Sequence, residues 1–169
     1  MRRKYLWLML GLTICVLAGT AGTAGATTAH ALTFGFENVN LGAPSPECPA
    51  LVVTFDLVSS TGSPLGAGSS CVQSVEGTCG FEFPVGCRQR VDSILTLTFA
   101  GRGVITARAT LWETMMPDFR LLQIVMGRVT GGSGDFAAAA GGLVGVGKLA
   151  FNPDGSTTYD GRWKLLLRS

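Results

Sequence analysis

The feature that most constrains the fold is a succession of short segments with alternating or β-branched side chains, separated by turns rich in glycine and proline. No stretch shows sustained helical periodicity. The pattern predicts about eight strands, and an all-β fold formed by a single antiparallel barrel, because closure of such a barrel leaves no exposed sheet edge. The expected strands cover residues 51–58, 81–85, 88–91, 93–99, 104–113, 121–129, 143–151 and 157–167, and residues 59–70 are expected to form a flexible loop.

The first 31 residues have the pattern of a secretory signal peptide. A basic start at residues 2–4 precedes an apolar run over residues 5–19 and a small-residue tract that ends at Ala31. We expect cleavage after Ala31, which leaves one secreted domain over residues 32–169. The apolar run is short for a membrane span, so no stable membrane association is expected after cleavage. A retained leader would instead act as an N-terminal anchor.

Removal of this leader changes both the charge and the chemistry of the chain. The full chain has 13 basic and 11 acidic residues, and loss of the three basic residues at 2–4 leaves 10 against 11. The mature chain therefore lacks the basic character expected of a nucleic-acid-binding protein. The single histidine, His30, also leaves. This excludes a Ser-His-Asp triad and a His-ligated metal, and we expect no metal and no cofactor.

Four cysteines follow the predicted leader: Cys48, Cys71, Cys79 and Cys87. An even number of cysteines in an exported chain indicates two disulfides, and four cysteines allow three connectivities. We favour Cys48–Cys71 with Cys79–Cys87, because each bond then closes a local hairpin. A zinc site is disfavoured because the spacing contains no Cys-x-x-Cys pair.

A glycine-rich turn over residues 131–136 is followed by a run of small residues. We expect Gly131, Gly132 and Gly134 to provide positive φ or close backbone approach, and Phe136 to fold back over the chain as a plug. The segment resembles the GGTGxFxxAxG signature of the allene oxide cyclase-like barrels, a superfamily that includes the plant dirigent proteins, with serine in place of the usual threonine. The resemblance covers about the last 75 residues and implies a barrel of that superfamily.

An eight-stranded barrel is either filled by its own side chains or able to hold one small ligand. The predicted strand 104–113 has two faces that bear on this choice. One face combines Arg108 with Trp112, a combination typical of a ligand pocket, and the other is apolar with mostly small residues and ends in Glu113. The alternative is that Arg108 simply faces solvent beside Trp112. Because a shift of one residue inverts a strand, the sequence leaves both assignments open.

Other polar or aromatic side chains interrupt the predicted strands, and each either lines a cavity or lies at an ordinary polar surface. The candidate ligand-binding residues are Trp112, Gln123, Tyr159 and Trp163. The candidate catalytic residues are Asp56, Arg108 and Glu113. A carboxyl group inside an apolar cavity has a raised pKa because of desolvation, and it can then donate a proton.

Three classes of function follow from these residues. The first, which the resemblance to dirigent proteins implies, is a protein that binds or sterically steers a small hydrophobic molecule or reactive intermediate. The second is a cofactor-free cyclase or isomerase in which Asp56 or Glu113 works with Arg108. The third is a secreted barrel without a small ligand that acts through its surface or as a homo-oligomer. The resemblance implies a trimer or dimer, with Ile105 and Leu111 pointing outward to form the interface.

Overall fold

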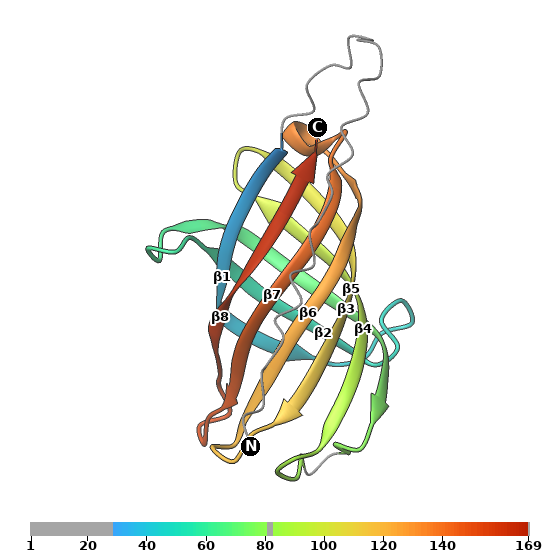
Figure 1. Cartoon of the computed structure of the whole chain (residues 1–169), viewed down its shortest axis with the longest axis vertical. Coiled ribbons are helices and arrows are strands. Elements are labelled where there is room, and N and C mark those ends of the chain that lie inside the picture. The colour runs from blue at the N-terminus through green and yellow to red at the C-terminus, as the bar shows by residue number, and fades with distance from the viewer. Residues whose placement is uncertain (1–28, 81–82, 169) are drawn as a thin grey trace, which may run out of the picture.

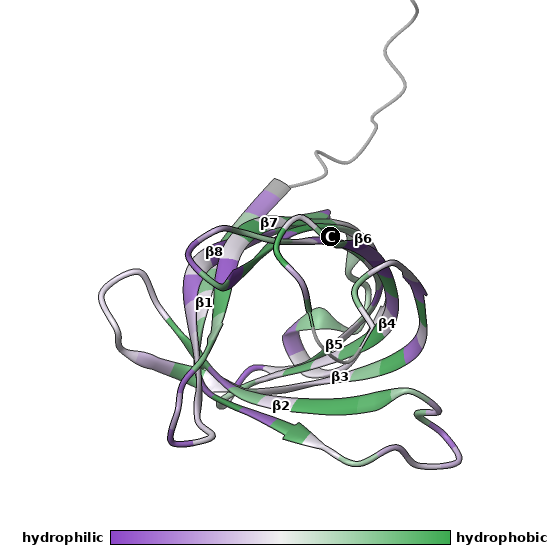
Figure 2. Ribbon diagram, turned by 90° about the horizontal axis from the view of Figure 1, so that it is seen from below, coloured by the Kyte–Doolittle hydropathy of each residue, from purple (hydrophilic) through white to green (hydrophobic). Residues whose placement is uncertain are grey.

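The computed structural model describes residues 29–80 and 83–168, which form a closed barrel of eight antiparallel strands (Figure 1). Each strand pairs with its neighbour in the sequence, and β8 pairs with β1 to close the ring, which Figure 2 shows end-on. The predicted all-β barrel is therefore confirmed. The strands are β1 (Ala29–Gly42), β2 (Leu51–Val58), β3 (Pro64–Gly77), β4 (Arg88–Phe99), β5 (Gly103–Met115), β6 (Arg120–Gly132), β7 (Ala140–Phe151) and β8 (Thr157–Arg168).

The described part of the chain contains a single short helical turn, the 3-10 helix η1 (Gly134–Phe136). No helix among these residues is long and apolar enough to cross a membrane. Residues 1–28 of the predicted leader lie outside the described residues. The predicted cleavage point after Ala31 falls within β1, where residues 29–31 pair with the last residues of β8.

Two of the observed strands were not predicted, and three of the predicted strands differ from those observed. The expected loop 59–70 is wrong, because β3 begins at Pro64. Its glycine- and serine-rich sequence has little intrinsic strand preference, and its pairing with β2 on one side and β4 on the other keeps it extended. β1 was also missed. The short strands expected at 88–91 and 93–99 are the single strand β4, and residues 83–85 of the strand expected at 81–85 lie in a loop.

The barrel interior near the β2–β3, β4–β5 and β6–β7 connections is filled by side chains, and we call this half the filled end. Its large residues have at most 3% of their surface exposed. Phe99 contacts Phe34 from β1 and Phe136 from η1, with ring centroids 6.1 and 5.3 Å away respectively. The side chains that fill this end are Phe34, Leu57, Leu97, Phe99, Ile105, Phe136, Leu143 and Leu165.

The glycine-rich turn closes the filled end, and Phe136 is the buried plug that the sequence predicted. Gly134 has a φ of +61°, and a side chain there would collide with the backbone of Arg102. A side chain at Gly132 would collide with the carbonyl oxygen of Phe136. Gly131 is different, because a side chain there would meet nothing within 4 Å. Two of the three glycines are therefore required by the turn, and the expectation for Gly131 is wrong.

Both disulfides lie toward the opposite half of the barrel, and their predicted pairing is confirmed. Cys48, in the β1–β2 connection, is bonded to Cys71 on β3. Cys79 and Cys87 close the β3–β4 connection on itself. The connections that follow β1 and β3 are thus held by covalent bonds, whereas the filled end is held by packed side chains.

Candidate functional site

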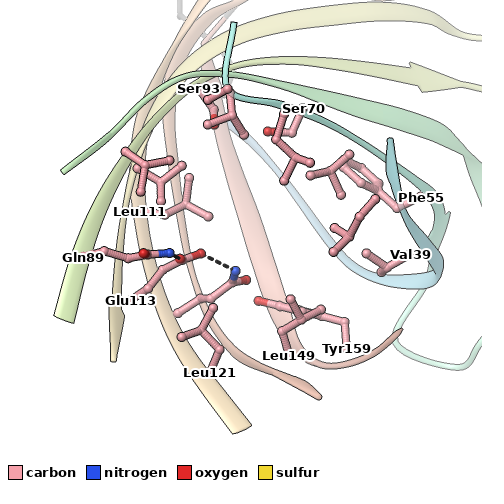
Figure 3. Close-up of a pocket in the computed structure, with 18 of the residues that line it drawn as sticks. Val39, Phe55, Ser70, Gln89, Ser93, Leu111, Glu113, Leu121, Leu149 and Tyr159 are labelled. Carbon is pink, nitrogen blue, oxygen red and sulfur yellow. Dashed lines mark hydrogen bonds between the residues drawn. The ribbon is translucent and has the colours of Figure 1, made fainter. Parts of the chain in front are cut away.

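A cavity of about 610 Å³ occupies the half of the barrel near the β1–β2, β3–β4, β5–β6 and β7–β8 connections (Figure 3). We call this half the open end. Its volume lies within the roughly 300–1,000 Å³ typical of small-ligand sites. Most of the lining is apolar. The described residues that line it are Phe36, Val39, Leu41, Ala50, Leu51, Val53, Phe55, Ser70, Val72, Val75, Gly77, Gly80, Phe83, Gln89, Val91, Ser93, Leu95, Leu111, Glu113, Leu121, Gln123, Leu149, Phe151, Tyr159 and Trp163.

A row of three polar side chains crosses one wall of this cavity. Glu113 on β5 is directly opposite Gln89 on β4 and Gln123 on β6 in the strand register. The Nε2 atom of Gln89 donates a hydrogen bond to Oε2 of Glu113, and the Nε2 atom of Gln123 donates one to Oε1 at 2.6 Å (Figure 3). Each carboxylate oxygen therefore accepts one amide N–H group. We refer to these three residues as the polar row.

Glu113 is in the interior because its position follows the alternation of β5. Residues 105, 107, 109, 111 and 113 are all buried, and Glu113 has 6% of its surface exposed. Burial raises the pKa of the Glu113 carboxyl, although the hydrogen bonds from Gln89 and Gln123 act in the opposite direction. Within the polar row, Glu113 is therefore a carboxyl group that binds its proton more tightly than an exposed glutamate does, inside an apolar cavity.

Tyr159 on β8 adds a hydroxyl group to the same cavity. Its oxygen accepts a hydrogen bond of 2.7 Å from Nε1 of Trp163, and among the described residues its own proton has no acceptor. Burial is the main cause that raises the pKa of Tyr159 to about 12, which keeps it neutral near pH 7. Figure 3 shows the hydroxyl pointing toward the side of the cavity that holds Glu113.

Glycines in β7 make room for these two aromatic rings. A side chain at Gly147 would collide with the Tyr159 hydroxyl group, and one at Gly145 would collide with the Trp163 ring. Gly147 is also the register partner of Gln123. The Tyr159 hydroxyl therefore occupies the space next to the polar row that a side chain on β7 would otherwise fill.

The wall opposite the polar row is aromatic and aliphatic. Phe36 is at its centre, with its ring centroid 4.5 Å from that of Phe55, 4.7 Å from that of Trp163 and 5.1 Å from that of Tyr159. Figure 3 shows Phe55 and Val39 across the cavity from Glu113. The cavity thus has an apolar side and a polar side, as an amphipathic ligand requires.

One more polar group lies deeper in the cavity. Ser93 on β4 lines it and has 3% of its surface exposed. Its hydroxyl oxygen has no hydrogen-bond partner among the described residues. A buried hydroxyl without a partner is unfavourable, so Ser93 is available to a polar atom of a ligand.

The structure separates the predicted site residues into two groups. Glu113, Gln123, Tyr159 and Trp163 line one cavity. Arg108 and Trp112 lie on the outer wall of β5, where Trp112 is 44% exposed, so their assignment to the cavity is wrong. The alternative, in which Arg108 faces solvent beside Trp112, is the one observed. The reason is the alternation of side chains along β5. The odd-numbered residues from 105 to 113 point into the barrel, and the even-numbered residues between them point outward.

Asp56 also lies outside the cavity. Its side chain is exposed on β2, and its Oδ2 accepts a hydrogen bond of 2.7 Å from Nδ2 of Asn38. The proposed interface residues Ile105 and Leu111 are likewise on the unexpected side, because both are buried in the interior. The apolar side chains that are exposed on the outer wall of β5, β6 and β7 are instead Trp112, Ile124, Met126, Val144 and Val146.

The sequence analysis missed Gln89 and Ser93. Each is two residues away from the buried Val91 on β4, so it shares the face of Val91. This alternation of side chains along the strand was the available signal. A prediction of two separate strands, 88–91 and 93–99, hides this alternation. One continuous strand places Gln89, Val91, Ser93 and Leu95 on the interior face, next to the interior face of β5.

Comparison of the chain with protein-family models, with curated proteins and with solved structures finds no match.

Proposed function

We propose that this protein is an exported barrel that binds or sterically steers a small hydrophobic ligand or reactive intermediate. The observation that carries the proposal is the amphipathic cavity of about 610 Å³ at the open end. A preformed apolar pocket with a few convergent polar groups is the usual form of a small-molecule site. The glycine-turn resemblance supports placement among the allene oxide cyclase-like and dirigent-like barrels, and the two disulfides support export.

Uptake of an apolar fluorescent dye, such as an anilinonaphthalene, tests this function. Val53 lines the cavity, so Val53→Trp fills part of it, whereas Val146 is 54% exposed on the outer wall and gives the matched control Val146→Trp. We expect saturable binding that Val53→Trp weakens about tenfold or more and that Val146→Trp leaves unchanged. Absence of binding, or an equal loss in both variants, would contradict the proposal.

A cofactor-free isomerase is the second candidate, because Glu113 is a buried carboxyl group with a raised pKa on the cavity wall. Such a group can exchange a proton with a bound ligand. Arg108 has no part in this version, since it lies on the outer wall. In turnover assays with a ligand recovered from the protein, Glu113→Gln should abolish conversion while binding persists. A steering protein would keep its effect on the reaction in that variant.

A further inference from the structure

We propose that the cavity selects a ligand with an apolar body and one protonated amine, and that Glu113 holds the amine. This inference rests on the proposed binding function and specifies its ligand class. It follows from the sign of the charge in the cavity, from the hydrogen-bonding groups that surround Glu113 and from the apolar wall opposite.

The charge of the cavity is the first observation. Among its described lining residues, the titratable side chains are Glu113 and Tyr159, and the lining includes no lysine, arginine or histidine. Tyr159 is neutral, so the one charge that this lining can carry is the negative charge of Glu113. A buried charge without an opposite partner is costly, and an ammonium group beside Glu113 would offset that cost.

The hydrogen-bonding groups around Glu113 point to the same ligand. Gln89 and Gln123 use their Nε2 atoms as donors to the carboxylate, so their amide oxygens remain acceptors. No described residue donates a hydrogen bond to those two oxygens. The polar row therefore offers acceptors on both sides of an anion, and an ammonium group provides three N–H donors. A fatty-acid carboxylate would instead bring acceptors and negative charge against the same groups.

The opposite wall defines the rest of the ligand. Phe55 and Val39 lie across the cavity from Glu113 (Figure 3), and Phe36 lines the same cavity with its ring against that of Phe55. An alkyl chain or ring system on this wall removes apolar surface from water and keeps the amine at Glu113. Tyr159 and Ser93 offer hydroxyl groups on the same lining for a second polar atom.

Three probes with the same chain and different heads test the inference: decylamine, decanol and decanoate, each below its micelle-forming concentration. Isothermal titration of the full-length protein with its disulfides formed should rank decylamine first, with decanoate weaker by about tenfold or more. Glu113→Gln should reduce the difference to about twofold or less. The matched variant Glu37→Gln, at an exposed glutamate of β1, should keep the wild-type ranking.

The pH dependence has a defined sign. Decylamine stays protonated between pH 5 and about 8, whereas Glu113 ionises as the pH rises through its raised pKa. The affinity of wild-type protein for decylamine should therefore rise as the pH rises through the pKa of Glu113, and the affinity for decanol should not. Gln89 and Gln123 do not titrate, and Tyr159 stays neutral throughout the range.

The outcomes separate this inference from the function on which it rests. Decanoate bound as tightly as decylamine by the unmodified protein would overturn the amine assignment and leave the ligand cavity standing. Retention of the amine preference in Glu113→Gln would overturn the role of Glu113. Failure of all three probes and of the fluorescent dye would overturn the binding function itself. The ranking on unmodified protein decides the ligand class without depending on the folding of any variant.

Discussion

The two halves of this barrel are built from the same eight strands and have opposite interiors. The filled end contains large apolar side chains with almost no exposed surface, and Phe136 seals it. The open end holds a cavity whose lining includes Glu113, Gln89, Gln123 and Tyr159. Strand pairing alone therefore does not determine whether a small barrel is solid or hollow. The choice is made by the residues at inward positions and by the turn that covers each end.

The two halves also differ in the interactions that stabilise them. At the filled end, packing supplies the stability, because every large side chain is surrounded by others. At the open end fewer side chains meet across the interior, and the two disulfides hold the connections that follow β1 and β3. The open end can consequently keep polar groups inside the barrel without filling the space between them.

The largest expected effect comes from removing the plug of the filled end. Phe136→Ala deletes a buried ring that contacts Phe99. The guanidinium carbon of Arg102 lies over this ring, 5.0 Å from the ring centroid. We expect a loss of about 3–5 kcal/mol in the free energy of unfolding, measured by denaturant titration. Phe119→Ala, at a residue that is 72% exposed, is the matched control and should change stability by about 0.5 kcal/mol or less. Equal effects would contradict the assignment of Phe136 as a plug.

A pair of leucines compares the two interiors directly. Leu97 is completely buried in the filled end, and Leu111 lines the cavity. Leu97→Ala should cost about 2–5 kcal/mol, since it creates a new void. Leu111→Ala should cost about 1 kcal/mol, because it enlarges a space that already exists, and it should weaken dye binding. If both substitutions cost the same, the open end is packed like the filled end and the comparison fails.

A smaller effect is expected from the ionisation of Glu113. Its pKa in the folded protein is raised from the ordinary value of 4.5, so the native state binds the proton more tightly than the unfolded chain. Its contribution to stability is complete below about pH 4.5 and is lost as the pH rises through the folded pKa. Thermal unfolding of wild type should therefore lose stability with rising pH relative to Glu113→Gln. Parallel pH profiles for the two proteins would show that Glu113 is not buried as described.

The sequence predicts the barrel class, the disulfide pairing and the Phe136 plug, because each depends on local features. Alternation within strands indicates the barrel, and cysteine spacing indicates the disulfide pairing. Gly132 and Gly134 leave room for the turn that carries Phe136. β3 was missed because its extended form depends on its neighbours, β2 and β4, and not on its own glycine- and serine-rich sequence. Such tertiary support is invisible to a segment read alone.

The site was predicted in part for a related reason. Glu113, Gln123, Tyr159 and Trp163 were named from polar or aromatic residues within strands, and all line one cavity. Arg108 was placed with them because residue types suggest a pocket but do not fix which face of a strand points inward. That orientation depends on closure of the whole barrel. Gln89 becomes visible only when its register opposite Glu113 is known.

The most direct test of the central claim uses the indole N–H signals of two tryptophans in a ¹⁵N-labelled protein. Trp163 lines the cavity and donates its indole hydrogen bond to Tyr159, whereas Trp112 lies on the outer wall. During titration with the apolar dye, we predict a saturable shift of the Trp163 indole signal and no shift of the Trp112 signal. A shift of Trp112 alone, or of neither signal, would contradict the claim that the open end of the barrel is a ligand-binding cavity.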